Sequence, residues 1–271
     1  MNETLILAFG IGLLVGSFVN VLIYRLPRMV MSSTDLANTT ERFDVCWPAS
    51  HCTHCLTPLK IWHNIPMLSF IWLKGRCGFC KHPISLLYPS IELITASIWL
   101  LCAWHWGFNA TGFCWAFFIT ALMAASVIDW QTTLLPDALT QSLVWMGLIA
   151  SALGWISVTP DQSIWGAVTG YAALWAVATA FEQLTGKQGM GAGDFKLLAG
   201  LGAWLGPLAL IPLVLLASLA GALVGLFLKF THKLGEDGYI PFGPFLGISG
   251  VLIAVLGMTR IAAWMGWSFI A

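Results

Sequence analysis

Charged residues are scarce in this 271-residue chain: Asp, Glu, Lys and Arg make up 9% of it, whereas hydrophobic residues make up 58%. Soluble domains have about 25% charged residues, so this chain has too few to cover a water-exposed surface. The surplus of apolar side chains must therefore face membrane lipid. Twelve basic residues balance twelve acidic ones, so the net charge gives no indication of a nucleic-acid partner, and none is expected.

The N-terminus lacks the features of a cleaved signal peptide. Residues 1–4 contain Glu3 but no Lys or Arg, and no small-residue cleavage site follows the apolar run Leu5–Tyr24. This run is about long enough to cross a bilayer, and it ends at the basic residue Arg25. We interpret residues 1–24 as a retained first transmembrane helix, with a cleaved signal as the alternative.

Long apolar runs are absent between residues 25 and 87, whereas the chain beyond Tyr88 is almost entirely apolar. The sequence therefore predicts three parts: the first helix in 1–24, a small extramembrane domain in 25–87, and a transmembrane domain in 88–271. The expected fold is all-α and polytopic, with about eight spans. These spans are 5–24, 88–106, 111–129, 138–157, 164–182, 194–206, 208–230 and 244–264.

The basic residues predict the orientation, because Lys and Arg are enriched in cytoplasmic loops. Seven of the twelve lie in residues 25–87. With this segment inside, the cytoplasmic loops hold eleven of the twelve, including Arg42 and Lys233, and only Arg260 is an exception. We therefore expect a multi-pass protein of a bacterial inner membrane, with residues 25–87 in the cytoplasm. Both Asp129 and Asp194 then lie at inner span ends.

Two CxxC pairs lie in this cytoplasmic segment, Cys52 with Cys55 and Cys77 with Cys80. The spacing favours a structural zinc site with four thiolate ligands. Two disulfides are the alternative, but cytoplasmic proteins keep their thiols reduced. Cys46, His51 and His54 are nearby and could replace one of the cysteines.

Acidic residues within membrane spans are costly, so each one is a candidate functional residue. Asp129 follows an apolar helix directly, and Asp194 begins another one after Gly189, Gly191 and Gly193. Glycines allow unusual backbone at membrane depth where it lines a cavity. Two facing aspartates can share one proton, with one carboxylate activating water and the other protonating a carbonyl oxygen. This pair is the basis for a predicted aspartic protease.

Simpler roles compete for the same acidic residues. Asp194, followed by Lys196, could be an interfacial charge near a helix N-terminus, where a carboxylate is favoured by the helix dipole. Asp137 could merely cap the fourth span. Glu92 lies inside the second span and could be functional or could hydrogen-bond a neighbouring helix.

The sequence resembles the type IV prepilin peptidases, also called prepilin leader peptidase/N-methyltransferases, over essentially its whole length. The matching segments are Gly16 to Pro27, Asn64 to Pro66 with the two CxxC pairs, Tyr88 to Leu93, Asp129 to Asp137, and Gly191 to Lys196. The last two look like the paired motifs of the GxGD aspartic proteases.

The resemblance implies two activities. One removes the leader from type IV prepilins and type II secretion pseudopilins, with Asp129 and Asp194 as the catalytic pair. The other methylates the newly exposed N-terminal residue, usually phenylalanine, with S-adenosyl-L-methionine as cofactor. The resemblance also implies zinc on Cys52, Cys55, Cys77 and Cys80. The sequence does not place the cofactor site, although the neighbourhood of Asn64, Pro66 and Glu92 is a candidate for methylation.

An ion-coupled transporter could use the same buried acids, but transporters often contain two broken helices in inverted repeats, and this sequence has one glycine break. A membrane scaffold would leave the intramembrane acids unexplained. The sequence gives no account of residues 31–50, of the oligomeric state or of the particular prepilins recognised.

Overall fold

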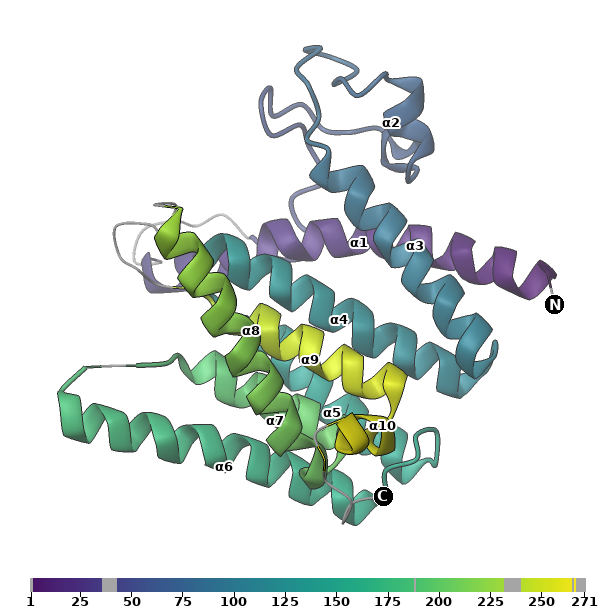
Figure 1. The fold of residues 1–271 in the computed structure, drawn as a ribbon. Helices are drawn as coiled ribbons and strands as arrows, with labels where there is room; N and C mark the ends of the chain where they lie inside the picture. Colours follow the sequence, from purple (N-terminus) through teal and green to yellow (C-terminus); the bar gives the residue numbers. More distant parts are fainter. Residues whose placement is uncertain (1, 36–42, 188, 232–239, 265, 267–271) are drawn as a thin grey trace. The chain divides into compact units, whose positions relative to one another are not determined.

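The computed structural model describes residues 2–35, 43–187, 189–231, 240–264 and 266 (Figure 1). Arg42 and Lys233, which contribute to the charge-based orientation, lie outside these residues. The chain divides into two compact units, residues 1–120 and residues 121–271, with the boundary inside helix α4. The separate division into a first span, a segment 25–87 and a domain 88–271 stays a prediction.

The described residues confirm the all-α class, because they form helices and only two isolated β-bridges. The helices of unit 1 are α1 (Asn2–Asp35), α2 (Leu68–Trp72), α3 (Leu87–Trp106) and the first part of α4 (Ala110–Thr132), with the 3-10 turn η1 (Ile61–Asn64). Unit 2 holds the rest of α4 and the following elements: α5 (Asp137–Ala152), α6 (Pro160–Thr185), α7 (Ala192–Leu205), η2 (Pro207–Ala209), α8 (Leu210–Phe230), α9 (Gly243–Leu256) and α10 (Met258–Trp264).

Within unit 1, α1 packs closely on α3. A Cβ atom at Gly16 would lie 2.7 Å from the Cα of Glu92, so only glycine permits this helix crossing. The Asn20 amide donates to the Tyr88 carbonyl at 3.0 Å. Farther along α1, the buried Arg25 guanidinium donates to the carbonyls of Asp44 and Pro48, at 2.9 and 2.6 Å. These bonds attach the segment that follows α1 to the helix itself.

Within unit 2, α7 is the central helix and contacts α5, α6, α8 and α9. Ten of its fourteen residues are buried, as expected for a helix that is apolar on every side. Trp204 is fully buried and donates through Nε1 to the Leu143 carbonyl of α5 at 2.8 Å. Ser163 of α6 donates to the Ala203 carbonyl at 2.7 Å. These contacts hold α7 between its neighbours.

Five helical segments among the described residues are long and apolar enough to cross a membrane: 3–31, 87–106, 110–132, 160–185 and 207–230. The chain is therefore a multi-pass membrane protein. Helices α5, α7 and α9 have 16, 14 and 14 residues, so the total of eight spans stays a prediction.

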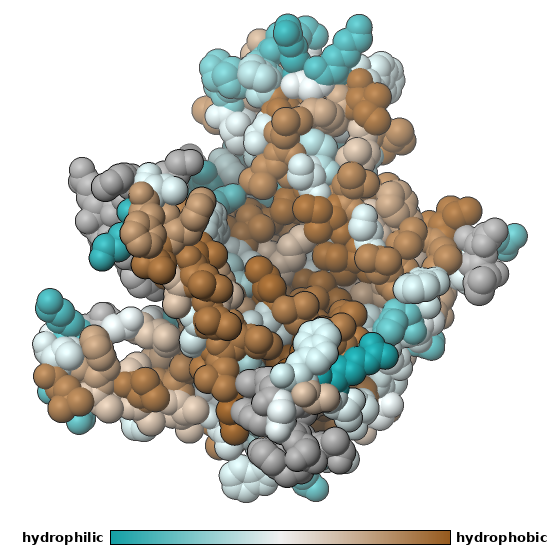
Figure 2. Space-filling model, in the orientation of Figure 1, coloured by the Kyte–Doolittle hydropathy of each residue, from teal (hydrophilic) through white to brown (hydrophobic). Residues whose placement is uncertain are grey.

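The outward side of α8 supports contact with lipid. Figure 2 shows apolar residues over α8, whereas hydrophilic residues gather over the segment of the paired cysteines. Large apolar side chains on α8 recur at helical spacing and are exposed: Ile211, Leu215, Leu219, Leu223, Leu226 and Phe230. Such a stripe on a folded unit is suited to a hydrocarbon environment rather than to water.

Two of the differences from the expected boundaries change the interpretation of a span. Helix α1 continues past Arg25 and through Pro27 to Asp35, so the start of the predicted extramembrane segment is helical. The expected span 244–264 is divided into α9 and α10 by Gly257, whose φ of 80° lies in the left-handed region. Glycine adopts this conformation without steric cost, which permits the break.

Candidate functional site

The paired cysteines lie on two knuckles, residues 51–58 and residues 76–83, with the same backbone hydrogen bonds. In the first knuckle, Cys52 N–H donates to the Thr57 carbonyl, and Leu56 N–H donates to the Cys52 carbonyl. In the second, Cys77 and Lys81 repeat this pattern. The equivalent residues Leu56 and Lys81 also share a positive φ, 56° and 60°. Each knuckle therefore turns its two cysteines the same way.

The sulfur atoms of Cys52, Cys55, Cys77 and Cys80 all lie within 4.8 Å of one another, so they could hold one metal ion. The sulfurs of Cys52 and Cys80 are 3.9 Å apart. A tetrahedral ion with bonds of about 2.3 Å would separate its sulfur ligands by about 3.8 Å. The donor set and its spacing therefore fit a structural tetrahedral site.

The remaining cysteines do not change this assignment. All seven cysteines are free, which excludes the alternative of two disulfides in this structure. The cluster found among the described residues contains neither Cys46 nor a histidine. Hydrogen bonds from Thr57 lower the pKa of the Cys55 thiol to about 6. Burial and the neighbouring cysteines raise the pKa of the Cys80 thiol to about 11, so the four sulfurs become thiolates together only with a cation bound among them.

The two candidate catalytic aspartates come together inside unit 2. Asp129 lies near the end of α4, and Asp194 lies in the first turn of α7. Their exposed fractions are only 3% and 4%. The Asp129 carboxylate acts electrostatically on Asp194, so residues 65 positions apart in sequence form one buried acidic pair.

The start of α9 holds the Asp129 side chain. The Gly243 N–H donates to Asp129 Oδ2 at 2.9 Å. A Cβ atom at Gly243 would lie 2.6 Å from the same oxygen, so a larger residue would push against the carboxylate. Leu135 lies against Gly243 and against Gly193, the residue before Asp194. Glycine therefore leaves room for the Asp129 carboxylate at position 243 and for Leu135 at position 193.

One oxygen of the pair is left without a protein partner. Asp194 Oδ1 is buried, and no described residue forms a hydrogen bond with it. Buried carboxylate oxygens normally have partners, because an unpaired one is costly. A proton shared with Asp129, a water molecule or a substrate carbonyl would each satisfy this atom.

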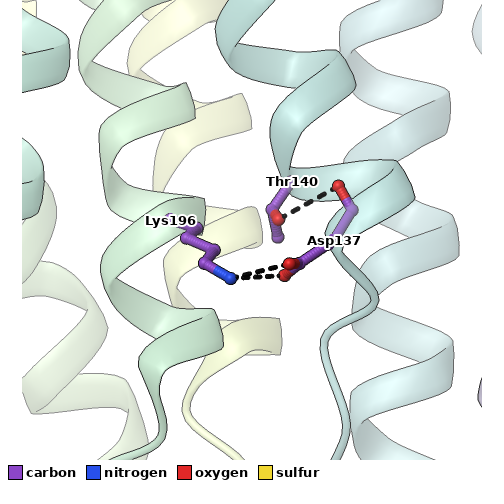
Figure 3. Close-up of polar contacts among 3 residues, drawn as sticks. All are labelled: Asp137, Thr140 and Lys196. Carbon is purple, nitrogen blue, oxygen red and sulfur yellow. Dashed lines mark hydrogen bonds and ion pairs between the residues drawn. The ribbon is translucent and has the colours of Figure 1, made fainter. Parts of the chain in front are cut away.

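Lys196 does not neutralise Asp194. Its Nζ atom contacts both carboxylate oxygens of Asp137, at 2.6 and 2.8 Å, as Figure 3 shows. Asp137 is the first residue of α5. The N-cap residue is Pro136, which forms no side-chain hydrogen bond with the helix. The ion pair thus joins the beginnings of α5 and α7. Asp194 is buried in the first turn of α7, and Asp137 has a cross-helix partner in addition to its place at the start of α5.

Glu92 lies away from this pair in sequence and belongs to unit 1. Its Oε2 atom accepts a hydrogen bond from the Met67 N–H at 2.8 Å. The side chain is half-buried, and no described residue donates to its other oxygen. Glu92 therefore holds the residue before α2 and keeps one free acceptor.

The sequence argument did not identify Gly243 or the Asp137–Lys196 pair. Gly243 lies in Pro241-Phe-Gly-Pro244, and a glycine between prolines at the start of a helix is a signal that could have been noticed. The pairing of Asp137 with Lys196 depends on the packing of α5 on α7, which no local pattern reveals.

The metal site makes a direct prediction. Purified protein should contain about one metal ion per chain by elemental analysis, since four thiolates complete one tetrahedron. Cys77→Ser should remove most of the metal, because it deletes one of the four ligands. Cys46→Ser is the matched control, since this cysteine is exposed and outside the cluster. Metal-free wild-type protein, prepared without chelators, would contradict the site, as would equal losses in both variants.

Comparison with known proteins places both units in one family. The model of the bacterial peptidase A24 N-terminal domain matches residues 11–106, and that of the type IV leader peptidase family matches residues 116–226. A comparison with solved structures found no match.

Three relatives named prepilin leader peptidase/N-methyltransferase illustrate the similarity. The protein from Pseudomonas putida is 42% identical over 260 residues, covering 93% of this chain and 90% of the relative. The protein from Dickeya chrysanthemi is 42% identical over 270 residues, with coverage of 95% and 93%. The protein from Aeromonas hydrophila is 41% identical over 280 residues, with coverage of 97% and 94%. With matches that extend over nearly the whole of each chain, this protein belongs to the type IV leader peptidase family.

Proposed function

We propose that this protein is an intramembrane aspartic endopeptidase that removes the leader from type IV prepilins and type II secretion pseudopilins, and that it also N-methylates the exposed N-terminal residue. The observation that carries the first activity is the buried, interacting pair of Asp129 and Asp194. The names of the relatives support both activities.

The geometry of the acidic pair fits peptide hydrolysis. One carboxylate takes a proton from a water molecule, which attacks the scissile carbonyl carbon, while the other donates a proton to the carbonyl oxygen. The Gly243 N–H fixes the orientation of Asp129. The unpaired Oδ1 of Asp194 leaves an acceptor for the water or for the shared proton. Because such a pair titrates as a unit, the acid and base roles belong to both residues together.

The metal is proposed to be zinc, held by Cys52, Cys55, Cys77 and Cys80. Four thiolates in a tetrahedron favour zinc, and a closed site of this kind is structural. Zinc would therefore fix the two knuckles and take no part in peptide hydrolysis. We place residues 25–87, which contain the knuckles, in the cytoplasm, and the protein in the bacterial inner membrane. Its partners are then the prepilin substrates and membrane lipid.

Substitution of the aspartates tests the proteolytic mechanism. Asp129→Asn and Asp194→Asn should each lower kcat/KM for prepilin cleavage by about 10²–10⁴-fold or more, because asparagine keeps the shape but cannot exchange a proton. Asp137→Asn should have a milder effect, since Lys196 can still donate to the amide oxygen. Mass spectrometry of the prepilin product measures cleavage. Near-normal cleavage by a folded Asp194→Asn enzyme would refute the mechanism.

The close contact at Gly243 gives a second test. Gly243→Ala should lower kcat/KM by about a hundredfold, because the new Cβ displaces the Asp129 carboxylate, and displacement of a reacting group by about 1 Å has an effect of this size. Gly10→Ala is the control, since a Cβ there meets nothing within 4 Å. Equal activity of the two variants would show that the position of Asp129 Oδ2 does not matter.

The orientation can be measured by labelling. Cysteines introduced one at a time, with the four cluster cysteines kept for the metal, should give additional labelling by a membrane-impermeant reagent from the periplasmic side at residue 109, and from the cytoplasmic side at exposed positions of residues 43–87. This orientation is expected because basic residues, which are enriched on the cytoplasmic side, are concentrated in residues 25–87. Labelling of residue 109 from the cytoplasmic side would contradict this orientation.

A further inference from the structure

Unit 1 contains a cavity of about 640 Å³ beside the cysteine knuckles. Helix α1 forms one wall, and the knuckles, α2 and the start of α3 form the others. Polar and aromatic side chains that line it include Asn20, Tyr24, His63, Phe70, Tyr88 and Glu92. Neither Asp129 nor Asp194 lines this cavity, and both belong to unit 2.

We propose that this cavity is the methyl-transfer site, where S-adenosylmethionine binds and Glu92 accepts a proton from the amine of the cleaved substrate. This inference rests on the proposed N-methyltransferase function and adds to it a location and a proton acceptor. The cavity is lined by residues of unit 1 and the acidic pair belongs to unit 2, so substitutions in the cavity should be able to remove methylation while cleavage is kept.

The size and lining of the cavity fit the cofactor. Pockets for ligands of this size have volumes of about 300–1,000 Å³ and combine apolar or aromatic walls with a few polar groups. Phe70 and Tyr88 provide ring surfaces for an adenine, and such rings also attract cations such as a sulfonium. One face of the Tyr24 ring is already covered by the Arg28 guanidinium. A second cavity in unit 1 has a volume of only about 10 Å³, which is too small for any cofactor.

Two lining residues carry polar atoms that no described residue satisfies. His63 Nδ1 is buried without a hydrogen-bond partner. Glu92 uses Oε2 to accept from Met67 N–H, and its Oε1 receives no hydrogen bond from the described residues. Buried polar atoms usually have partners, so the unpaired His63 Nδ1 indicates a ligand, whereas Glu92 Oε1 is an accessible acceptor that a ligand can reach. A carboxylate also matches the two cations of the reaction, the substrate ammonium and the methyl donor.

The chemistry requires a proton acceptor. At neutral pH the new N-terminus is mainly an ammonium, whose nitrogen has no lone pair to donate. Glu92 would take one proton and leave a neutral amine. S-adenosylmethionine supplies a methyl group whose bond to sulfur breaks, with its electron pair passing to sulfur, as the nitrogen–carbon bond forms. Glu92 then releases its proton to solvent, and the methylated ammonium leaves.

Met67 connects this role to the structure. Its N–H donates to Glu92 Oε2, which fixes the carboxylate on the cavity wall. Met67 itself has a φ of 59° and is the N-cap residue of α2. The carboxylate is thus oriented by backbone, and Oε1 is left for the substrate. Positioning of this kind supplies much of the rate of a displacement reaction.

Binding is measured separately from catalysis. Isothermal titration of the purified, metal-containing protein with S-adenosylhomocysteine reports occupancy of the cavity without turnover. Ser17 lies on α1 in the cavity wall, so Ser17→Trp should weaken binding by about tenfold or more. Ser90→Trp is the control, because Ser90 is exposed on α3 and does not line the cavity. Unchanged binding by a folded Ser17→Trp protein would place the cofactor elsewhere.

The proton-transfer role is tested by Glu92→Gln, which keeps an acceptor for Met67 N–H. Methylation should fall by about 10²–10⁴-fold, while cleavage stays close to wild type. Glu182→Gln, at an exposed position of α6, is the matched control. Normal methylation by Glu92→Gln would exclude Glu92 from the reaction. Equal loss of cleavage, methylation and thermal stability would assign it a purely structural role and overturn the proposal.

The proposed function and the proposed methyl-transfer site are refuted by different results. Wild-type protein that neither cleaves a prepilin nor methylates the product would refute the proposed function itself. Wild-type protein that performs both reactions, with Ser17→Trp and Glu92→Gln also normal, would refute only the cavity as the methyl-transfer site.

Discussion

Two carboxylates are buried inside the apolar helix bundle of unit 2, and the surrounding residues must stabilise them there. Charged groups within a membrane are costly unless they have partners or a reaction to perform. Asp129 has the Gly243 N–H, and Asp194 has the first turn of α7 with its favourable dipole. One oxygen of Asp194 still has no partner among the described residues. The bundle therefore holds an acidic pair that is complete only with a proton, a water molecule or a substrate.

The position of α7 depends on contacts away from the pair. Its body is enclosed by neighbouring helices, and Trp204 is anchored to α5 at the far end. At its beginning, Lys196 is paired with Asp137 rather than with the nearby Asp194. This choice of partner has a chemical consequence, because a lysine on Asp194 would hold that carboxylate ionised and would oppose sharing of a proton. The Lys196 ammonium is therefore two residues from Asp194 in sequence but is paired with Asp137 instead.

Local patterns predicted much of this structure, and packing determined the rest. The CxxC spacing indicated the cysteine cluster, because a short turn fixes two sulfurs. Long apolar runs gave the helices, but α1 passes through Pro27, and Gly257 divides α9 from α10. The partners of Asp129 and Lys196 come from helices distant in sequence, so no local pattern could supply them. The cavity beside Glu92 likewise exists only after α1, α2 and α3 have packed.

The most direct test of the acidic pair is binding of a prepilin peptide whose scissile bond is replaced by a hydroxyethylene group. This group mimics the tetrahedral transition state, so it should bind about 10²-fold or more tightly than the substrate. A photoreactive label beside the hydroxyl should attach to α4, to α7, or to Leu135 and the start of α9, which lie beside the pair, and competition by the unlabelled peptide should prevent attachment. Binding no tighter than that of the substrate, or attachment away from all of these, would contradict the account.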